Sequence, residues 1–265
     1  MLYREFEPTG AARSLIKCFW LLDDPSPSPE PQRVFPDGRS ELIFNLAEPF
    51  ENLSRTGWEK QPQSFVVGQI TGPMIIRSCG PAKILGVRFH PHGANGLLNL
   101  PSNELTDSVV ALSDLNSQLY SLTDELHEGR WPEEQVRRTN EAIVSFASRN
   151  SRSHDQAIAF AVRKFERTRG LASIADVARE IGISTRQLQR RFLAAVGITP
   201  KVFCRIQRFQ HVIREMENPN HQWTDTAISA GYYDQAHLIR DFRQFAGTPP
   251  SALETSELKL GKLFC

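Results

Sequence analysis

The chain has few cysteines, and it lacks long hydrophobic runs. Its four cysteines, Cys18, Cys79, Cys204 and Cys265, show no paired spacing. Disulfide frameworks and zinc sites both need clustered cysteines, so we expect reduced thiols and no metal or other cofactor. The N-terminus lacks the apolar core of a signal peptide, and no run approaches the length needed to span a membrane. These absences predict a cytoplasmic protein without a membrane segment.

A strong charge of either sign is also missing. The chain has 31 Lys and Arg against 30 Asp and Glu, so its formal net charge is +1. Any basic stretch must therefore be local and diluted by a neutral or acidic remainder. A length of 265 residues suits two domains, each with its own core. We predict domains at 1–150 and 151–265.

One helix-turn-helix pattern occurs twice near the C-terminus, about fifty residues apart. The matched positions are Ala178 and Ala227, Gly182 and Gly231, Leu188 and Leu238, Phe192 and Phe242, and Gly197 and Gly247. A small residue lets two helices cross closely, and the glycine that follows can end the first helix in the left-handed conformation. Ser184 and Asp234 stand where the next helix needs an N-cap. A helical hairpin built for packing alone is the alternative, and the repetition disfavours it.

A long helix connects the two units. Pro200 suits a first turn, apolar residues then follow at helical spacing, and Asn218-Pro219-Asn220 closes the segment. We therefore predict a first helix-turn-helix at about 173–196, a linker helix at about 200–216 and a second helix-turn-helix at about 223–246. If both units enter the major groove on one side of a duplex, they should lie roughly 34 Å apart.

The outward face of the first unit has the chemistry of a DNA-reading surface. Arg186, Gln189 and Arg190 lie opposite the apolar face, and Arg and Gln suit guanine and adenine edges. Between Ser184 and Arg214 there is no Asp or Glu. The basic residues of this stretch are Arg186, Arg190, Arg191, Lys201, Arg205, Arg208 and Arg214. Such a stretch can neutralise several phosphates. A solvated basic face is the alternative, although solvated faces usually mix both signs.

The second unit is less basic. It is expected to present Gln235, His237 and Arg240 outward, together with Asp234 and Asp241. Two carboxylates on this face would oppose the phosphates, so we predict that the second unit reads DNA more weakly.

Residues from about 158 to 253 resemble the DNA-binding domain of the AraC/XylS family of bacterial transcription regulators. The resemblance is carried by the segment Gly231-Tyr232-Tyr233-Asp234-Gln235-Ala236-His237-Leu238-Ile239-Arg240-Asp241-Phe242 and by Gly247-Thr248-Pro249-Pro250. It implies a two-lobed domain of seven helices that inserts 184–196 and 234–245 into adjacent major-groove segments. The DNA-binding residues that we predict are Ser184, Thr185, Arg186, Gln189, Arg190, Lys201, Arg205, Gln235, His237 and Arg240.

The first ninety residues have a different pattern, in which short β-type runs alternate with turns. The predicted strands are 14–22, 33–35, 41–46, 64–70, 74–78 and 84–89. From His92 the pattern becomes helical, with one amphipathic helix marked by Leu112 to Leu126 and another after Trp131-Pro132. We predict an α+β protein, with a β-rich, cupin-like barrel and flanking helices before an all-α C-terminal domain. Segments 35–46 and 86–94 also resemble an uncharacterised sensor domain that is found fused to such DNA-binding domains.

Two N-terminal patterns leave alternatives open. His90-Pro91-His92 has a spacing that cupin enzymes use for metal, but no third ligand follows nearby, so loop or pocket-rim histidines are favoured over a metal site. The Asp37-Gly38-Arg39 turn, with Glu41, could place charges at the mouth of a barrel. A turn in which Asp and Gly serve geometry alone is the favoured alternative.

These observations predict a sequence-specific DNA-binding transcription regulator without enzymatic activity. Double-stranded DNA is the main partner. By resemblance, RNA polymerase is another, and a small-molecule effector and a homodimer are compatible with the family. Two alternatives remain: a cupin-type metalloenzyme with an accessory DNA-binding domain, and an architectural protein that binds DNA without sequence preference.

Overall fold

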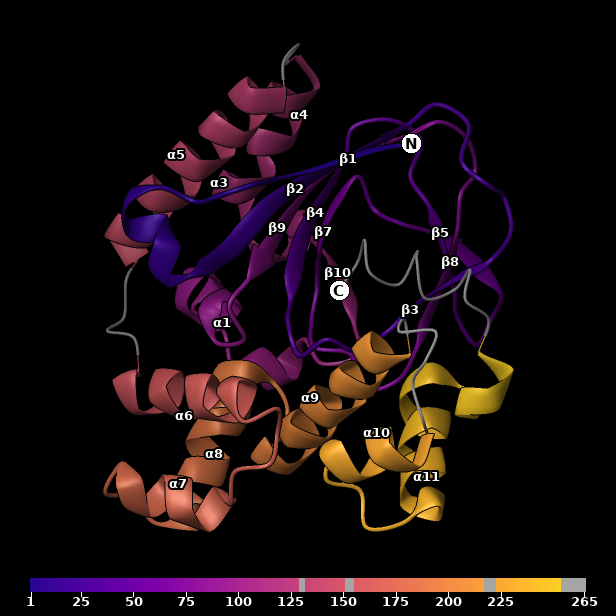
Figure 1. Cartoon of the computed structure of the whole chain (residues 1–265). Coiled ribbons are helices and arrows are strands. Elements are labelled where there is room, and N and C mark those ends of the chain that lie inside the picture. Colours follow the sequence, from indigo (N-terminus) through magenta and orange to yellow (C-terminus); the bar gives the residue numbers. More distant parts are fainter. Residues whose placement is uncertain (129–131, 151–154, 217–222, 254–265) are drawn as a thin grey trace.

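The computed structural model describes residues 1–128, 132–150, 155–216 and 223–253, with a β-rich N-terminal part above a helical C-terminal part in Figure 1. The larger antiparallel sheet has the order β1-β2-β9-β4-β7-β10. Its strands are β1 (Leu2–Phe6), β2 (Ile16–Asp24), β4 (Glu41–Asn45), β7 (Ser64–Val67), β9 (Ala82–Phe89) and β10 (Val109–Ala111). The smaller sheet, β3-β8-β5-β6, consists of β3 (Gln32–Val34), β5 (Glu51–Leu53), β6 (Trp58–Lys60) and β8 (Met74–Arg77).

The large sheet is buried on both faces, because its strands alternate apolar side chains between two cores. In β4, Leu42 and Phe44 join the core beneath the helices, whereas Ile43 joins the core shared with the small sheet. In β9, Leu85 likewise joins the core beneath the helices, and Ile84 joins the core shared with the small sheet. This period-two alternation is what a pleated strand imposes. The β-rich prediction is confirmed. Within the described residues the strands form two separate sheets and do not close into a barrel.

Helices cover the other face of the large sheet (Figure 1). They are α1 (Gly93–Leu98), α2 (Leu112–Leu115), α3 (Ser117–Tyr120), α4 (Leu122–Glu128) and α5 (Pro132–Asn150). The single amphipathic helix predicted from Leu112 to Leu126 is wrong, since three short helices replace it. Asn116 has an extended backbone, and its side chain accepts from Leu119 N at 3.0 Å, so it ends one helix and caps the next. The leucines are nevertheless buried.

The C-terminal part contains α6 (Gln156–Arg167), α7 (Ile174–Glu180), α8 (Thr185–Val196), α9 (Pro200–Glu215), α10 (Trp223–Ser229) and α11 (Gln235–Ala246), then the 3-10 helix η3 (Pro250–Ala252). One core joins these helices around a run of aromatic rings. Phe192 packs edge-on against Phe203, with ring centroids 5.4 Å apart, and Phe209 packs against Phe242 at 5.0 Å. The long helix α9 therefore contacts both helix-turn-helix units. No helix in the described ranges has the length and apolarity to cross a membrane.

The segment Phe35–Arg39, which we call the docking segment, joins the N-terminal domain to α9. Phe35 is buried in the C-terminal core. Gln210 Nε2 on α9 donates to the carbonyl of Pro36 at 2.7 Å, and Arg39 donates to Glu166 on α6 at 2.7 Å. Gly38 has φ +84°, and a Cβ there would lie 2.8 Å from the ring of Phe203. Glycine is therefore required both by the turn and by the close approach.

The N-terminal domain also contacts the C-terminal ends of α8 and α11. Ser102, in the 3-10 helix η2 (Ser102–Glu104), donates to the carbonyl of Ala195 at 3.0 Å. Thr106 donates to the carbonyl of Gly197 at 2.6 Å. Pro73 lies so close to Gly247 that a Cβ on that glycine would be 3.3 Å from its ring. The β-rich domain thus contacts both helix-turn-helix units as well as the helix between them.

Candidate nucleic-acid interface

The second helix of the first unit, α8, is fixed by its N-terminal cap and its apolar face. Ser184 Oγ accepts from Gln187 N at 3.2 Å, and the Gln187 side chain accepts from Ser184 N at 3.0 Å, which completes a capping box. Leu188 and Phe192 are fully buried. At the other end Gly197 has φ +98°, the left-handed conformation that ends a helix. The predicted cap and buried face are confirmed.

The opposite face of α8 is polar and exposed. Arg186, Gln189 and Arg190 are all exposed, and no ion pair joins them to any described residue. Thr185 is exposed in the first turn, and Ser184 is exposed although its hydroxyl is engaged in the cap. Residues three and four apart share one side of a helix. The guanidinium and amide groups are therefore presented together on one surface.

The second unit repeats this framework with a different cap. Asp234 Oδ1 accepts from His237 N at 2.7 Å, which confirms the predicted N-cap of α11. Leu238 and Phe242 are buried, as predicted. Gln235 and Arg240 are exposed. His237 is half-buried, and its ring lies edge-on against Tyr232 at 5.1 Å between centroids.

The prediction that Asp241 faces outward is wrong. Its side chain is 2% exposed and pairs with Arg205 of α9 at 2.7 Å. Position 241 lies one residue before the buried Phe242 and three after the buried Leu238, so it falls at the edge of the apolar face. Arg205 also donates to Gln244 at 2.7 Å. One of the two carboxylates expected to oppose phosphates is therefore absent from the outward face.

The basic stretch between 184 and 214 is only partly available to phosphates. Arg191 pairs with Asp155 at 2.5 Å, Arg205 pairs with Asp241, and Arg208 lies over the ring of Tyr232 at 5.7 Å. These three guanidiniums hold helices together. Lys201, at the start of α9, is exposed and forms no ion pair with a described residue. Arg205 thus has a structural role, and its DNA contact stays a prediction.

Tyr233, which was not among the predicted DNA-binding residues, is 94% exposed in the turn before α11. Ile228, on α10 of the same unit, is 69% exposed. A large exposed aromatic beside a helix N-terminus can contact a phosphate or a sugar through its hydroxyl. The signal was present in the paired tyrosines after Gly231, but the sequence alone did not show which ring is buried. Tyr232 is the buried one, at 5% exposure.

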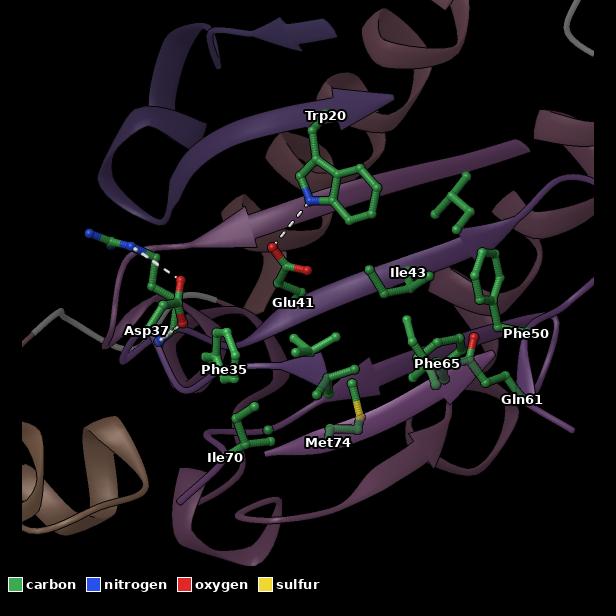
Figure 2. Close-up of a pocket in the computed structure, with 16 residues that line it drawn as sticks. Trp20, Phe35, Asp37, Glu41, Ile43, Phe50, Gln61, Phe65, Ile70 and Met74 are labelled. Carbon is green, nitrogen blue, oxygen red and sulfur yellow. Dashed lines mark hydrogen bonds and ion pairs between the residues drawn. The ribbon is translucent and has the colours of Figure 1, made fainter. Parts of the chain in front are cut away.

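A second candidate site is a cavity between the two sheets of the N-terminal domain (Figure 2). Its wall is mainly apolar, with Ile43, Phe65 and Met74 among the lining residues. Asp37, Arg39 and Glu41 also line it. These are the charges that the sequence analysis considered for the mouth of a barrel, and the structure brings them together at one cavity.

Glu41 is a polar group of the cavity that is held by two side-chain hydrogen bonds. Its Oε1 accepts from Trp20 Nε1 at 3.1 Å and from Arg88 Nε at 2.6 Å. Burial raises the pKa of Glu41, against the opposing effect of the Arg88 charge. Burial alone would lower the pKa of Arg88, but the Glu41 and Asp37 carboxylates outweigh it and raise that pKa. Gly86 makes room for the indole, because a Cβ there would lie 2.0 Å from the ring of Trp20.

The two histidines that the sequence analysis considered as metal ligands stack on each other. The rings of His90 and His92 lie 6.2 Å apart at 14°. Burial, and then the charge of Arg39, lower the pKa of His90. Among the described residues, no three His, Cys, Asp or Glu side chains are close enough to hold a metal ion.

Sequence comparisons match two parts of the chain. Residues 4–111 match a domain of unknown function (DUF6597), and residues 177–256 match a helix-turn-helix domain. The first match agrees with the predicted resemblance of 35–46 and 86–94 to an uncharacterised sensor domain. The second covers all of the second unit and all but the first residues of the first unit. No curated protein matches the chain.

Several solved structures are similar to the chain. ToxT from Vibrio cholerae is 10% identical over 88% of this chain and 96% of its own, with a TM-score of 0.46. A ToxT structure with bound unsaturated fatty acid is 11% identical over 88% and 94%, with a TM-score of 0.44. The AraC-like transcriptional activator CuxR is 15% identical over 73% and 72%, with a TM-score of 0.25.

The matched domain, the duplicated units and the motif that closes the second of them agree with one another. This chain therefore has an AraC-type helix-turn-helix domain in its C-terminal part, joined to an N-terminal domain of unknown function.

Proposed function

We propose that α8 and α11 each read base edges in the major groove and thereby give this regulator sequence specificity. The observation that carries the proposal is the pair of capped helices, each with a buried Leu–Phe face and an exposed face of donors and acceptors. Arg186, Gln189 and Arg190 are the readers on α8, assisted by Ser184 and Thr185. The readers on α11 are Gln235, His237 and Arg240.

Phosphate contacts come mainly from groups near the ends of the reading helices. Lys201 lies in the first turn of α9, just after the end of α8. Its exposed ammonium can approach a phosphate without giving up a partner among the described residues. Arg205 can do so only by sharing a guanidinium that already bonds to Asp241 and Gln244.

We further propose that the N-terminal domain regulates the reading helices through its direct contacts with them. The docking segment holds α9, and Ser102 and Thr106 hold the end of α8. A change in the N-terminal domain can therefore alter the relative position of the two units without a flexible intermediary. Contact with RNA polymerase and the formation of a homodimer belong to the same proposal by resemblance.

Competition binding tests sequence-specific reading. Genomic sites bound in cells would be recovered, and the full chain would be titrated onto one such site against an excess of random duplex. Specific recognition predicts a preference of at least about a thousandfold. Equal competition by random duplex would instead support the architectural alternative and contradict the proposal.

A further inference from the structure

The cavity between the sheets has an unused acceptor in its wall. Both hydrogen bonds to the Glu41 carboxylate fall on Oε1, from Trp20 and Arg88, and no described residue donates to Oε2. Figure 2 shows the carboxylate among the apolar side chains that line the cavity. Arg88, which pairs with this carboxylate, is buried, with 5% of its side chain exposed. A molecule in the cavity could therefore donate one hydrogen bond to Oε2 without breaking either bond to Oε1.

The charges around the cavity favour a neutral occupant. Two carboxylates, Asp37 and Glu41, line it and would repel an anion. Arg88 already pairs with Glu41, and Arg39, which bonds to Glu166 at 2.7 Å, also lies 3.9 Å from Asp37. A buried ammonium would lose its water for carboxylates that already have a cation beside them, which is costly in an apolar site. A hydroxyl or N–H group on an apolar body satisfies Oε2 without that cost.

The cavity is small, so an occupant must move part of its wall. Its volume is about 60 Å³. By comparison, a protein cavity that holds benzene measures about 150 Å³. The walls contributed by β4 and β9 are hydrogen-bonded to neighbouring strands on both sides. Phe35, Asp37 and Arg39 instead belong to the docking segment, which lies between β3 and β4. The docking segment is therefore the wall that can yield most easily.

We propose that this cavity binds a neutral, mainly apolar molecule with one hydroxyl or N–H donor, and that binding loosens the docking segment from α9. The coupling follows from geometry, because Phe35 lines the cavity and also packs against Phe209 of α9, with 6.0 Å between ring centroids. This part rests on the proposed control of the reading helices by the N-terminal domain. The ligand class rests on the cavity alone.

Calorimetric titration of the full chain tests the ligand class with four small probes of similar size. Phenol is neutral with a donor, toluene is neutral without one, benzoate is an anion and benzylamine is a cation. We expect phenol to bind at least about tenfold more tightly than each of the others. Equal or tighter binding of benzoate or benzylamine, or no binding of phenol at millimolar concentration, would overturn the proposal.

Two variants locate the binding site. Met74 is half-buried at the cavity, so Met74→Trp should fill it while the chain still folds, and phenol binding should be lost. Leu53→Trp is the matched control, because Leu53 lies 45% exposed on the same small sheet outside the cavity. Retained phenol binding in Met74→Trp, with a normal circular dichroism spectrum, would place the ligand elsewhere and contradict the proposal.

Amide hydrogen exchange tests whether ligand binding loosens the docking segment from α9. With phenol bound, amides in 35–41 should exchange several-fold faster, whereas those of β1 should not change. Unchanged exchange in 35–41 at saturation would overturn the coupling. None of these measurements contains DNA, so their failure leaves the reading role of α8 and α11 intact. Loss of specificity in the competition assay would likewise leave the calorimetric result intact.

Discussion

The two helix-turn-helix units share a framework but differ in what surrounds it. Both have a capped second helix, a buried Leu–Phe pair and a terminal glycine in the left-handed conformation. The exposed arginines of α8 are Arg186 and Arg190, whereas those of α11 are Arg240 and Arg243, with a half-buried histidine, His237, on the same helix. The framework therefore fixes where side chains point, and the residues added to it determine how strongly each unit can bind DNA.

The units also differ in how an arginine ties them to the rest of the domain. In the first, Arg191 pairs with Asp155, and both side chains are about one-third exposed, at 37% and 30%. In the second, Arg205 pairs with Asp241, whose side chain is 2% exposed. Water screens the first pair and hardly reaches the second carboxylate. The same kind of contact should thus have unequal importance for stability.

The largest expected effect is the difference in stability between variants that remove Arg205 and variants that remove Arg191. Arg205→Ala leaves the Asp241 carboxylate buried without its cation, so we expect a loss of about 3–5 kcal/mol in the free energy of unfolding. Arg191→Ala should cost no more than about 1 kcal/mol, because its partner remains solvated. Urea unfolding followed by circular dichroism measures both. Equal losses in the two variants would show that the burial of Asp241 does not matter.

The next largest expected effect is on the affinity for the specific DNA site. Arg190→Ala and Arg240→Ala should each cost about 1–3 kcal/mol of specific binding and relax base preference at one position. We expect the larger loss for Arg190, since α8 has no acidic residue, whereas Asp234 is exposed at the start of α11. Arg179→Ala is the control, because Arg179 is an exposed arginine on α7 that pairs with Asp176 at 2.7 Å. If specific affinity in both reading variants matched the control, these residues would not be the readers.

A smaller, sequence-independent effect is expected at Lys201. Lys201→Ala should weaken specific and random DNA alike and reduce the slope of log affinity against log salt by about one. Titrations at several salt concentrations measure this slope. A loss confined to the specific site would mean that Lys201 contacts a base.

The smallest expected effect is the pH dependence of stability that comes from the ion pair between Arg191 and Asp155. Burial acts to raise the pKa of Asp155, but the hydrogen bond from Arg191 and the Ile158 amide outweigh it and lower that pKa below the ordinary value of 3.8. Its stabilising contribution is therefore complete above the unfolded-state pKa and is lost as pH falls through the folded-state pKa. The stability difference between the native chain and Asp155→Asn should shrink between about pH 5 and pH 3. A constant difference over that range would contradict this assignment.

The C-terminal domain could be predicted from sequence in more detail than the N-terminal domain, for a physical reason. Caps, terminal glycines and apolar faces are local, so Ser184, Asp234, Leu188 and Phe242 showed their roles through spacing alone. The role of Asp241 could not be predicted from spacing, because its burial depends on Arg205, which lies 36 residues earlier. Spacing cannot show such a partner.

In the N-terminal domain the decisive pairings are between distant segments. β2 pairs with β9, and β4 lies between β9 and β7. Six of the ten strands in the described residues were predicted, because their composition is local, whereas β1, β5, β6 and β10 were not predicted. The closure of a sheet depends on distant segments, and two open sheets are found where a barrel was expected. The docking segment shows the same limit. Asp37-Gly38-Arg39 was read as a turn, whereas its neighbour Phe35 and its contacts with α9 became visible only in three dimensions.

Selection from a pool of random duplexes tests the central claim most directly, because it asks whether two units read DNA together. The account predicts an enriched site with two conserved half-motifs about 10–10.5 base pairs apart, centre to centre. In Arg190→Ala the half-motif read by α8 should lose information while the other is kept. A single half-motif that is unaffected by both Arg190→Ala and Arg240→Ala, or no enrichment at all, would contradict the account.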